Sequence, residues 1–267
     1  MTSSPTTLAA GASTPAPAPS RRVVDAPTRM FHWLFALSFA GAWLTGDGER
    51  WRALHVVLGY TMAGLLAFRI VYGLVGPRHA RLSLTWRRLA AAPQWLRSAV
   101  ATRLAGANWR QGQNLLGPLA IVLMLALVPP LVLSGYATDH EWADGEWLEE
   151  IHEFFANTML TVVFAHLALL ALLSLLRRQN QALPMLTGRL PGRGPDLAKK
   201  NRAGLALLLL AAVLAYGSWE WQQAPNGLLP SKAWRGDEHR QRRHGGEDDG
   251  ERVRAPVRPA PVRSILV

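Results

Sequence analysis

The chain has 267 residues, 49% of them hydrophobic, and carries 29 Lys and Arg residues against 18 Asp and Glu. A single soluble domain seldom combines so much apolar and so much basic character, so the two should lie in separate segments. The absence of cysteine excludes disulfides, cysteine-ligated zinc, iron–sulfur clusters and covalent haem attachment through a C-x-x-C-H motif. Any cofactor must therefore be held by histidine, carboxylates or packing.

Both ends of the chain have compositions typical of disorder. The first twenty residues are uncharged, rich in Pro, Ala, Ser and Thr, and lack the apolar region of a signal peptide. We assign residues 1–21 to a disordered extension. The last segment, 223–267, mixes both charge signs with Gly and Pro and is also expected to be disordered.

Between these ends, five apolar segments have membrane-spanning character. The first is short for a span, and Pro129 and Pro130 predict a kink near the end of the third. The five segments cover residues 30–46, 53–75, 115–135, 147–176 and 203–219.

Charge asymmetry between the connections predicts an orientation. The two connections that follow the second and fourth segments carry fourteen Lys and Arg residues against the single acid Asp196, whereas the connection after the third segment and the first residues of the fourth carry six acids and no Lys or Arg. Basic loops stay in the cytoplasm, so we expect a multi-pass protein of the bacterial inner membrane with a cytoplasmic N-terminus and a periplasmic C-terminus. The basic excess then needs no nucleic-acid partner, and we expect none.

The first basic connection contains SLTWRRLAAAPQWLRSAVATRL, where Trp, Leu and Val alternate with Arg. This pattern favours helix turns lying in the membrane interface, interrupted at Pro93. A solvated basic connector is the alternative.

Four of the eight histidines lie in apolar segments, where ionisable residues are costly and are candidates for function. His152 and His166 are fourteen residues apart on one helix, which places them on one face at a separation of about 21 Å. The other four, His79, His140, His239 and His244, are expected to be solvated or interfacial.

The four intramembrane histidines pair by depth. His32 begins the first helix at the inner level that His166 reaches, and His55 begins the second helix at the outer level of His152. Two histidine pairs at two depths are what two bis-histidine haem groups require, because each iron takes one axial nitrogen from each side. Hydrogen-bonded bundle histidines are the alternative.

Arg69 follows His55 by fourteen residues and therefore lies on nearly the same helix face, at the inner level. Its guanidinium is a candidate partner for a propionate of the inner haem. Snorkelling of the side chain to the membrane interface is the alternative.

Several motifs occur in order around these histidines: VVDAPTRMFHW, LHVVLGY, FRIVYGLVGPRHARLS, GQNLLG and LPMLTGR. From about residue 22 to 192 the chain resembles the bacterial cytochrome b-561 family, in the cytochrome b/b6-domain branch related to hydrogenase b-type subunits. The resemblance implies an all-α integral membrane protein with a four-helix haem-binding bundle over residues 22–192. Residues 193–222 would add a loop and a fifth transmembrane helix.

The resemblance further implies a di-haem b-type cytochrome that moves electrons in a respiratory chain, between the quinone pool and a redox partner such as a c-type cytochrome or a hydrogenase-like complex. It would hold two non-covalent haem b groups and act on quinone or quinol. Such a protein is an electron-transfer component of an oxidoreductase. A transporter with a proton or metal path, or a membrane anchor without a catalytic role, are the alternatives that a haem spectrum would exclude.

Overall fold

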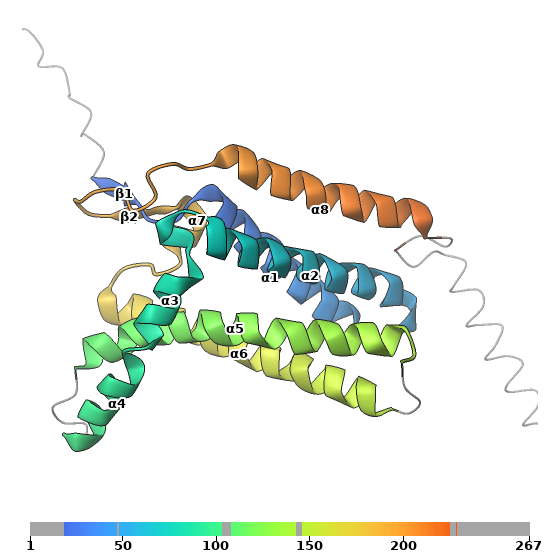
Figure 1. Cartoon of the computed structure of the whole chain (residues 1–267), viewed down its shortest axis with the longest axis horizontal. Coiled ribbons are helices and arrows are strands. Elements are labelled where there is room, and N and C mark those ends of the chain that lie inside the picture. Colours follow the sequence, from blue (N-terminus) through green and yellow to red (C-terminus); the bar gives the residue numbers. More distant parts are fainter. Residues whose placement is uncertain (1–18, 47, 103–107, 143–145, 225–227, 229–267) are drawn as a thin grey trace, which may run out of the picture.

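The computed structural model describes residues 19–46, 48–102, 108–142, 146–224 and 228, and its architecture is almost entirely helical. Five long helices run back and forth side by side (Figure 1). They are α1 (Ala26–Thr45), α2 (Arg52–Val75), α5 (Trp109–Asp139), α6 (Trp147–Arg177) and α8 (Ala203–Gln223).

The shorter elements gather mainly at one end of the bundle, which we call the sheet end; the opposite end, with the α1–α2 and α5–α6 connections, is the far end (Figure 1). A short 3-10 helix, η1 (Glu49–Trp51), lies at the far end before α2. The sheet-end elements are β1 (Ser20–Arg22), η2 (Arg78–Ala80), α3 (Leu82–Leu89), α4 (Ala92–Ala101), α7 (Leu183–Thr187) and β2 (Arg189–Pro191).

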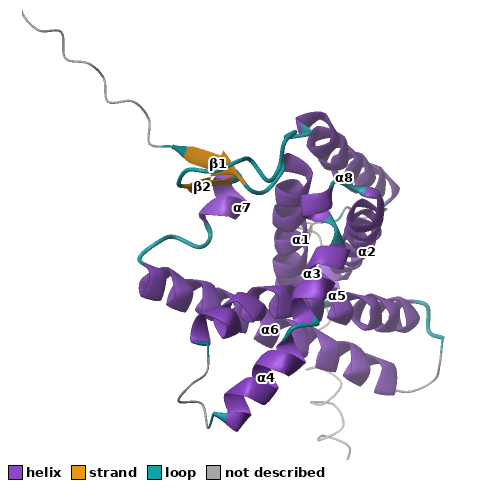
Figure 2. Cartoon of the chain, turned by 60° about the vertical axis from the view of Figure 1, so that its left-hand side comes forward, coloured by secondary structure: helices purple, strands orange, loops and turns teal. Residues whose placement is uncertain are grey.

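The backbone of α6 lies apart from those of α1 and α2. α1 packs against α2, α2 against α5 and α5 against α6, whereas in the described residues the backbones of α1 and α6 approach each other at isolated points at most. α8 packs against α1, on the side away from α5 and α6 (Figures 1 and 2). The first four long helices therefore form a bundle that α8 extends.

Four of the described helices, α2, α5, α6 and α8, are long and apolar enough to cross a membrane. Their outer faces expose large apolar side chains, among them Leu133, Leu172 and Leu207. Lipid accommodates such faces, whereas a contiguous apolar surface of this kind would be unfavourable in water. α1 corresponds to the first apolar segment but is not among the four, so the expectation of five crossings stays a prediction.

At the sheet end, the N-terminal strand β1 joins the start of the chain to the segment that follows α6. β1 pairs antiparallel with β2, with Arg21 opposite Leu190, and the amides of Val23 and Val24 donate to the carbonyl of Gly188. Gly188 has a φ of +78°, and a Cβ there would lie 2.8 Å from the Val24 carbonyl oxygen, so the turn favours glycine. The last two residues that we assigned to the extension, Ser20 and Arg21, lie in this strand.

Three further expectations concern the basic connection, the prolines of the third apolar segment and the two ends of the chain. The basic connection forms α3 and α4, with Pro93 in the first turn of α4, as the sequence predicted. α5 continues as helix through Pro129 and Pro130. Residues 1–18 and nearly all of the tail 223–267 lie outside the described residues, so their predicted disorder is not tested.

Candidate cofactor-binding site

A cavity of about 590 Å³ opens between the helices at the far end. His55, near the start of α2, and His152, near the start of α6, both line it, and their ring centroids are 5.9 Å apart. This separation is compatible with one metal atom between two imidazole nitrogens, with bonds of about 2 Å each. Other lining residues are Phe39, Ala42, Gly46, Gly59, Met62, Leu131, Gly135, Tyr136, Asp139 and Glu149.

Backbone carbonyls fix the tautomer of both imidazoles. Nδ1 of His55 lies 2.7 Å from the Ala42 carbonyl oxygen, and Nδ1 of His152 lies 3.1 Å from that of Leu131. Because a carbonyl only accepts hydrogen bonds, Nδ1 must carry the proton, which leaves the Nε2 lone pair free for a metal. Metal-ligating histidines are typically oriented in this way.

Small residues make room for these rings. A Cβ added at Gly135 of α5 would lie 2.8 Å from Cε1 of His152 and 3.0 Å from its Nδ1. Any larger side chain would therefore displace the imidazole or the helix.

The second pair lies nearer the sheet end. His32 of α1 and His166 of α6 are close enough for the charge of His166 to act on His32. In the described residues, Nδ1 of each ring is buried without a hydrogen-bond partner. These two half-buried imidazoles each carry a buried nitrogen that no group of the described residues pairs with, as expected of a ligand site.

An apolar layer separates the two pairs. Phe39, Met62 and Met159 belong to one buried cluster, and each lies seven residues from a histidine of the sequence: His32, His55 and His152, in that order. Seven residues are about two helical turns, so the layer lies on the same helix faces as the imidazoles and midway between the two levels.

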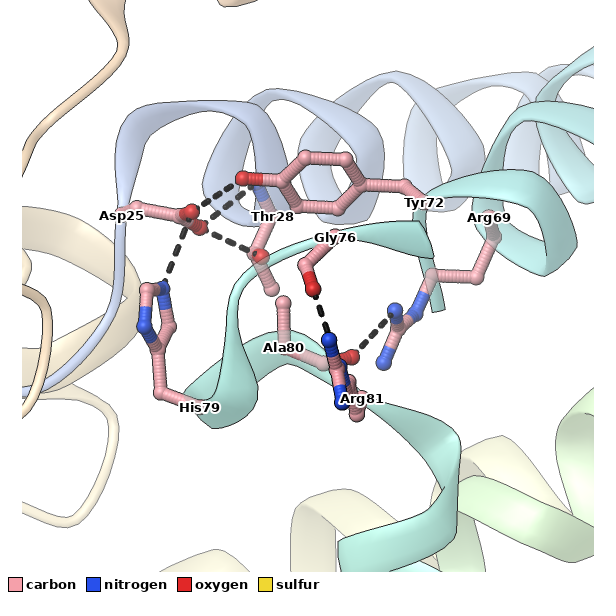
Figure 3. Close-up of polar contacts among 8 residues, drawn as sticks. All are labelled: Asp25, Thr28, Arg69, Tyr72, Gly76, His79, Ala80 and Arg81. Carbon is pink, nitrogen blue, oxygen red and sulfur yellow. Dashed lines mark hydrogen bonds and ion pairs between the residues drawn. The ribbon is translucent and has the colours of Figure 1, made fainter. Parts of the chain in front are cut away.

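His79 was expected to be solvated or interfacial, and the structure excludes the first of these, because the side chain is largely buried. Its Nε2 lies 3.0 Å from Oδ2 of Asp25, and only 13% of its side chain is exposed. Asp25 itself is fully buried and also accepts hydrogen bonds from Thr28 and from the Tyr72 hydroxyl (Figure 3). Sequence reasoning missed this cluster, although an acid directly before Ala-Pro and the first helix is a recognisable N-cap signal.

The electrostatics of Asp25 follow from these contacts. Burial by itself would raise the pKa of the carboxyl, but hydrogen bonds from Thr28 and Tyr72 and the close contact with His79 outweigh burial and hold the pKa below its usual range. Asp25 is therefore an anion within the protein at neutral pH.

Arg69 lies in the same region and is buried. Its Nη1 donates to the carbonyl oxygen of Ala80 over 3.0 Å (Figure 3). This bond uses one of the five guanidinium donors. It does not test a propionate contact, which remains a prediction.

The described residues thus define a class of protein: a bundle of apolar helices that brings imidazoles together in two pairs, one of them at a cavity. A planar macrocycle with a metal centre fits the free Nε2 atoms, the glycine-lined wall and the unpartnered Nδ1 atoms. The chain matches prokaryotic cytochrome b561 over residues 23–188, more than half of its length, and it belongs to this family. It is a multi-pass membrane cytochrome of the b type, which binds b-type haem and serves electron transfer.

Comparison with curated proteins and with solved structures gives no significant match.

Proposed function

We propose that the chain is a di-haem cytochrome that carries electrons across the inner membrane between the quinone pool and a redox partner in a respiratory chain. His55 and His152 would hold one haem b at the far end, and His32 and His166 the other nearer the sheet end. The single observation that carries this proposal is the convergence of His55 and His152 on one cavity, each with Nδ1 held by a carbonyl.

A bound haem accepts and gives up one electron at a time. The residues of this chain would do the rest: His55 and His152 would hold one iron and His32 and His166 the other, and two imidazoles on each iron would leave no open position for oxygen or other substrates. The apolar layer of Phe39, Met62 and Met159 keeps water out between the sites, so only electrons would pass.

The orientation of the bundle follows from its charges. The two connections that follow α2 and α6 carry fourteen of the 29 Lys and Arg residues and one acid, and the α5–α6 connection at the far end is acidic. By the positive-inside rule, this distribution supports a cytoplasmic sheet end and a periplasmic far end. With five crossings, the N-terminus would be cytoplasmic and the C-terminus periplasmic.

The far end also offers a surface for a redox partner. Asp139 and Glu149 line the cavity there, and Asp139 is paired with Arg52 at 3.2 Å. Acidic residues at the mouth of an electron-transfer site would attract a basic carrier, such as a c-type cytochrome, by complementary charge. A hydrogenase-like complex is the other partner class that the family relationship suggests.

The test is a reduced-minus-oxidised absorption spectrum of the purified protein with a haem count per chain. We expect about two haem groups that acidified organic solvent extracts, because no cysteine is present to bind them covalently. Quinol should reduce them. A colourless protein would contradict the proposal, and a count of one would contradict its di-haem form.

A further inference from the structure

A buried anion lies at the sheet end, beyond the imidazole pairs. Asp25 caps α1, its Oδ1 accepting a hydrogen bond from Oγ1 of Thr28 over 2.6 Å. Its Oδ2 accepts the hydroxyl of Tyr72 from α2 and faces Nε2 of His79 from η2 (Figure 3). Three segments of the chain therefore converge on one carboxylate that has no exposed surface.

His79 gives this carboxylate a route to water. Its side chain keeps 13% of its surface exposed, whereas Asp25 has none. A proton can therefore reach or leave the imidazole without opening the bundle. Imidazole is also the side chain that changes charge between about pH 5 and pH 8.

The other charged groups around the cluster do not titrate in that range. Arg69 on α2 lies close enough to interact with the charge of Asp25, and Arg202, before α8, acts on the Tyr72 hydroxyl. Guanidinium groups stay charged, and a phenol ordinarily loses its proton only near pH 10. The charge of the cluster in this range is thus set by His79.

This charge is close to one of the proposed haem sites. His32 follows Asp25 by seven residues, about two helical turns or roughly 10 Å along α1, on the same face. Buried charges are screened much less than exposed ones. A negative charge on Asp25 must therefore disfavour an added electron at the His32–His166 site, and a proton on His79 must relieve that effect.

We propose that Asp25 and His79 form a proton-binding site coupled to the electron at the His32–His166 site. This inference rests on the proposed function. When that site accepts one electron from a quinol or another reduced carrier, His79 takes up a proton from water on the sheet-end side. Oxidation of the site releases the proton, and no other bond is made or broken.

The experiment measures proton uptake directly, in the haem-loaded protein in weakly buffered detergent solution with a pH-indicator dye. Photochemical or electrochemical reduction of the wild-type chain should take up protons between about pH 5 and pH 8. His79→Gln should lose most of this uptake while keeping both haem groups and the wild-type absorption spectrum. His140→Gln, an exposed histidine at the far end, should behave as the wild type.

Redox titration against pH supplies the second measurement. The redox component that is missing from His32→Ala belongs to the His32–His166 site. Its midpoint potential should fall as pH rises, by at most ~59 mV for each tenfold change in proton concentration. Asp25→Asn should raise this potential at high pH and flatten its dependence, since the anion is gone. Tyr72→Phe, which keeps Asp25 and His79, should retain the dependence.

The outcomes separate the inference from the proposed function. A protein with two haem groups whose potentials do not depend on pH, or a His79→Gln variant with wild-type proton uptake, overturns the inference alone. A protein without haem overturns both.

Discussion

A Cβ added at Gly135 would lie 2.8 Å from Cε1 of His152. Gly135→Ala should therefore push the imidazole out of the far-end cavity, because helix α5 cannot move without disturbing its packing on α6. We expect roughly one of the two haem groups to be lost, as measured by haem per folded protein. Gly117→Ala, on the same helix but with open space around the added Cβ, should keep both. Equal haem content in the two variants would contradict the predicted role of Gly135.

The pairing of the four histidines predicts nonadditive losses. His32→Ala and His166→Ala should each remove one haem, and the double variant should lose no more than either, because both residues serve one iron. His32→Ala combined with His55→Ala should leave none. The measurement is haem content of protein that still elutes as a folded species in detergent, because a lost ligand also removes stability. A folded His32→Ala/His55→Ala variant with full haem content would show that other residues bind the irons.

The two sites should differ in potential. At the far end, both imidazoles donate from Nδ1 to carbonyl oxygens, which raises their basicity and favours the oxidised iron. The sheet-end imidazoles have no such partner among the described residues. We therefore expect the far-end haem to have the lower potential. A redox titration of His55→Ala should then lack the lower-potential component; loss of the higher one would contradict the assignment.

Acid should destabilise the bundle through Asp25. The pKa of this carboxyl is lower in the folded protein than in the unfolded chain, so its contribution is complete above the unfolded value near 4 and is lost as pH falls through the folded value. Thermal unfolding in detergent, followed by circular dichroism, should show a falling midpoint in this acidic range.

Asp25→Asn should weaken this acid dependence and should also cost about 1 kcal/mol or more of stability at neutral pH, because charged hydrogen bonds are lost. Asp139→Asn at the far end, where the carboxylate is partly exposed and paired with Arg52, is the matched control and should keep the dependence. If both variants respond to acid as the wild type does, Asp25 is not the source of the acid dependence of stability.

Reporter fusions test the orientation. A reporter that is active only in the cytoplasm should work after Gly194 at the sheet end, and one that is active only in the periplasm should work after Glu141 at the far end. The opposite pattern would exchange the two sides of the membrane and with them the compartment that supplies the proton to His79.

Much of the site could be predicted from the sequence because it depends on helix periodicity. The fourteen-residue interval between His152 and His166, and the positions of His32 and His55 near opposite helix ends, already indicate two levels. The convergence of His55 and His152 on one cavity agrees with that prediction. The metal itself and the pairing of His32 with His166 at one iron remain predictions.

The Asp25 cluster could not be predicted in the same way. Asp25, Tyr72 and His79 come from three segments, and their meeting depends on how the chain turns at Gly76 and on the packing of η2 against α1. A histidine beside Pro77 and Arg78 has the local pattern of a surface residue. Only the tertiary fold shows that it faces a buried carboxylate. The β1–β2 pairing was missed for the same reason, since its strands are more than 160 residues apart in the sequence.

Both histidine pairs draw one member from α6, and β1 closes the bundle by pairing with β2, which follows α6 in the chain. During synthesis, α1 and α2 therefore emerge and enter the membrane long before either pair can be complete. If the two pairs hold haem as proposed, neither site could trap its cofactor until α6 has been inserted, and the strand that leads into α1 must wait still longer for its partner. Cofactor capture would then be a late event in biogenesis, and we expect a chain truncated before α6 to remain in the membrane without haem.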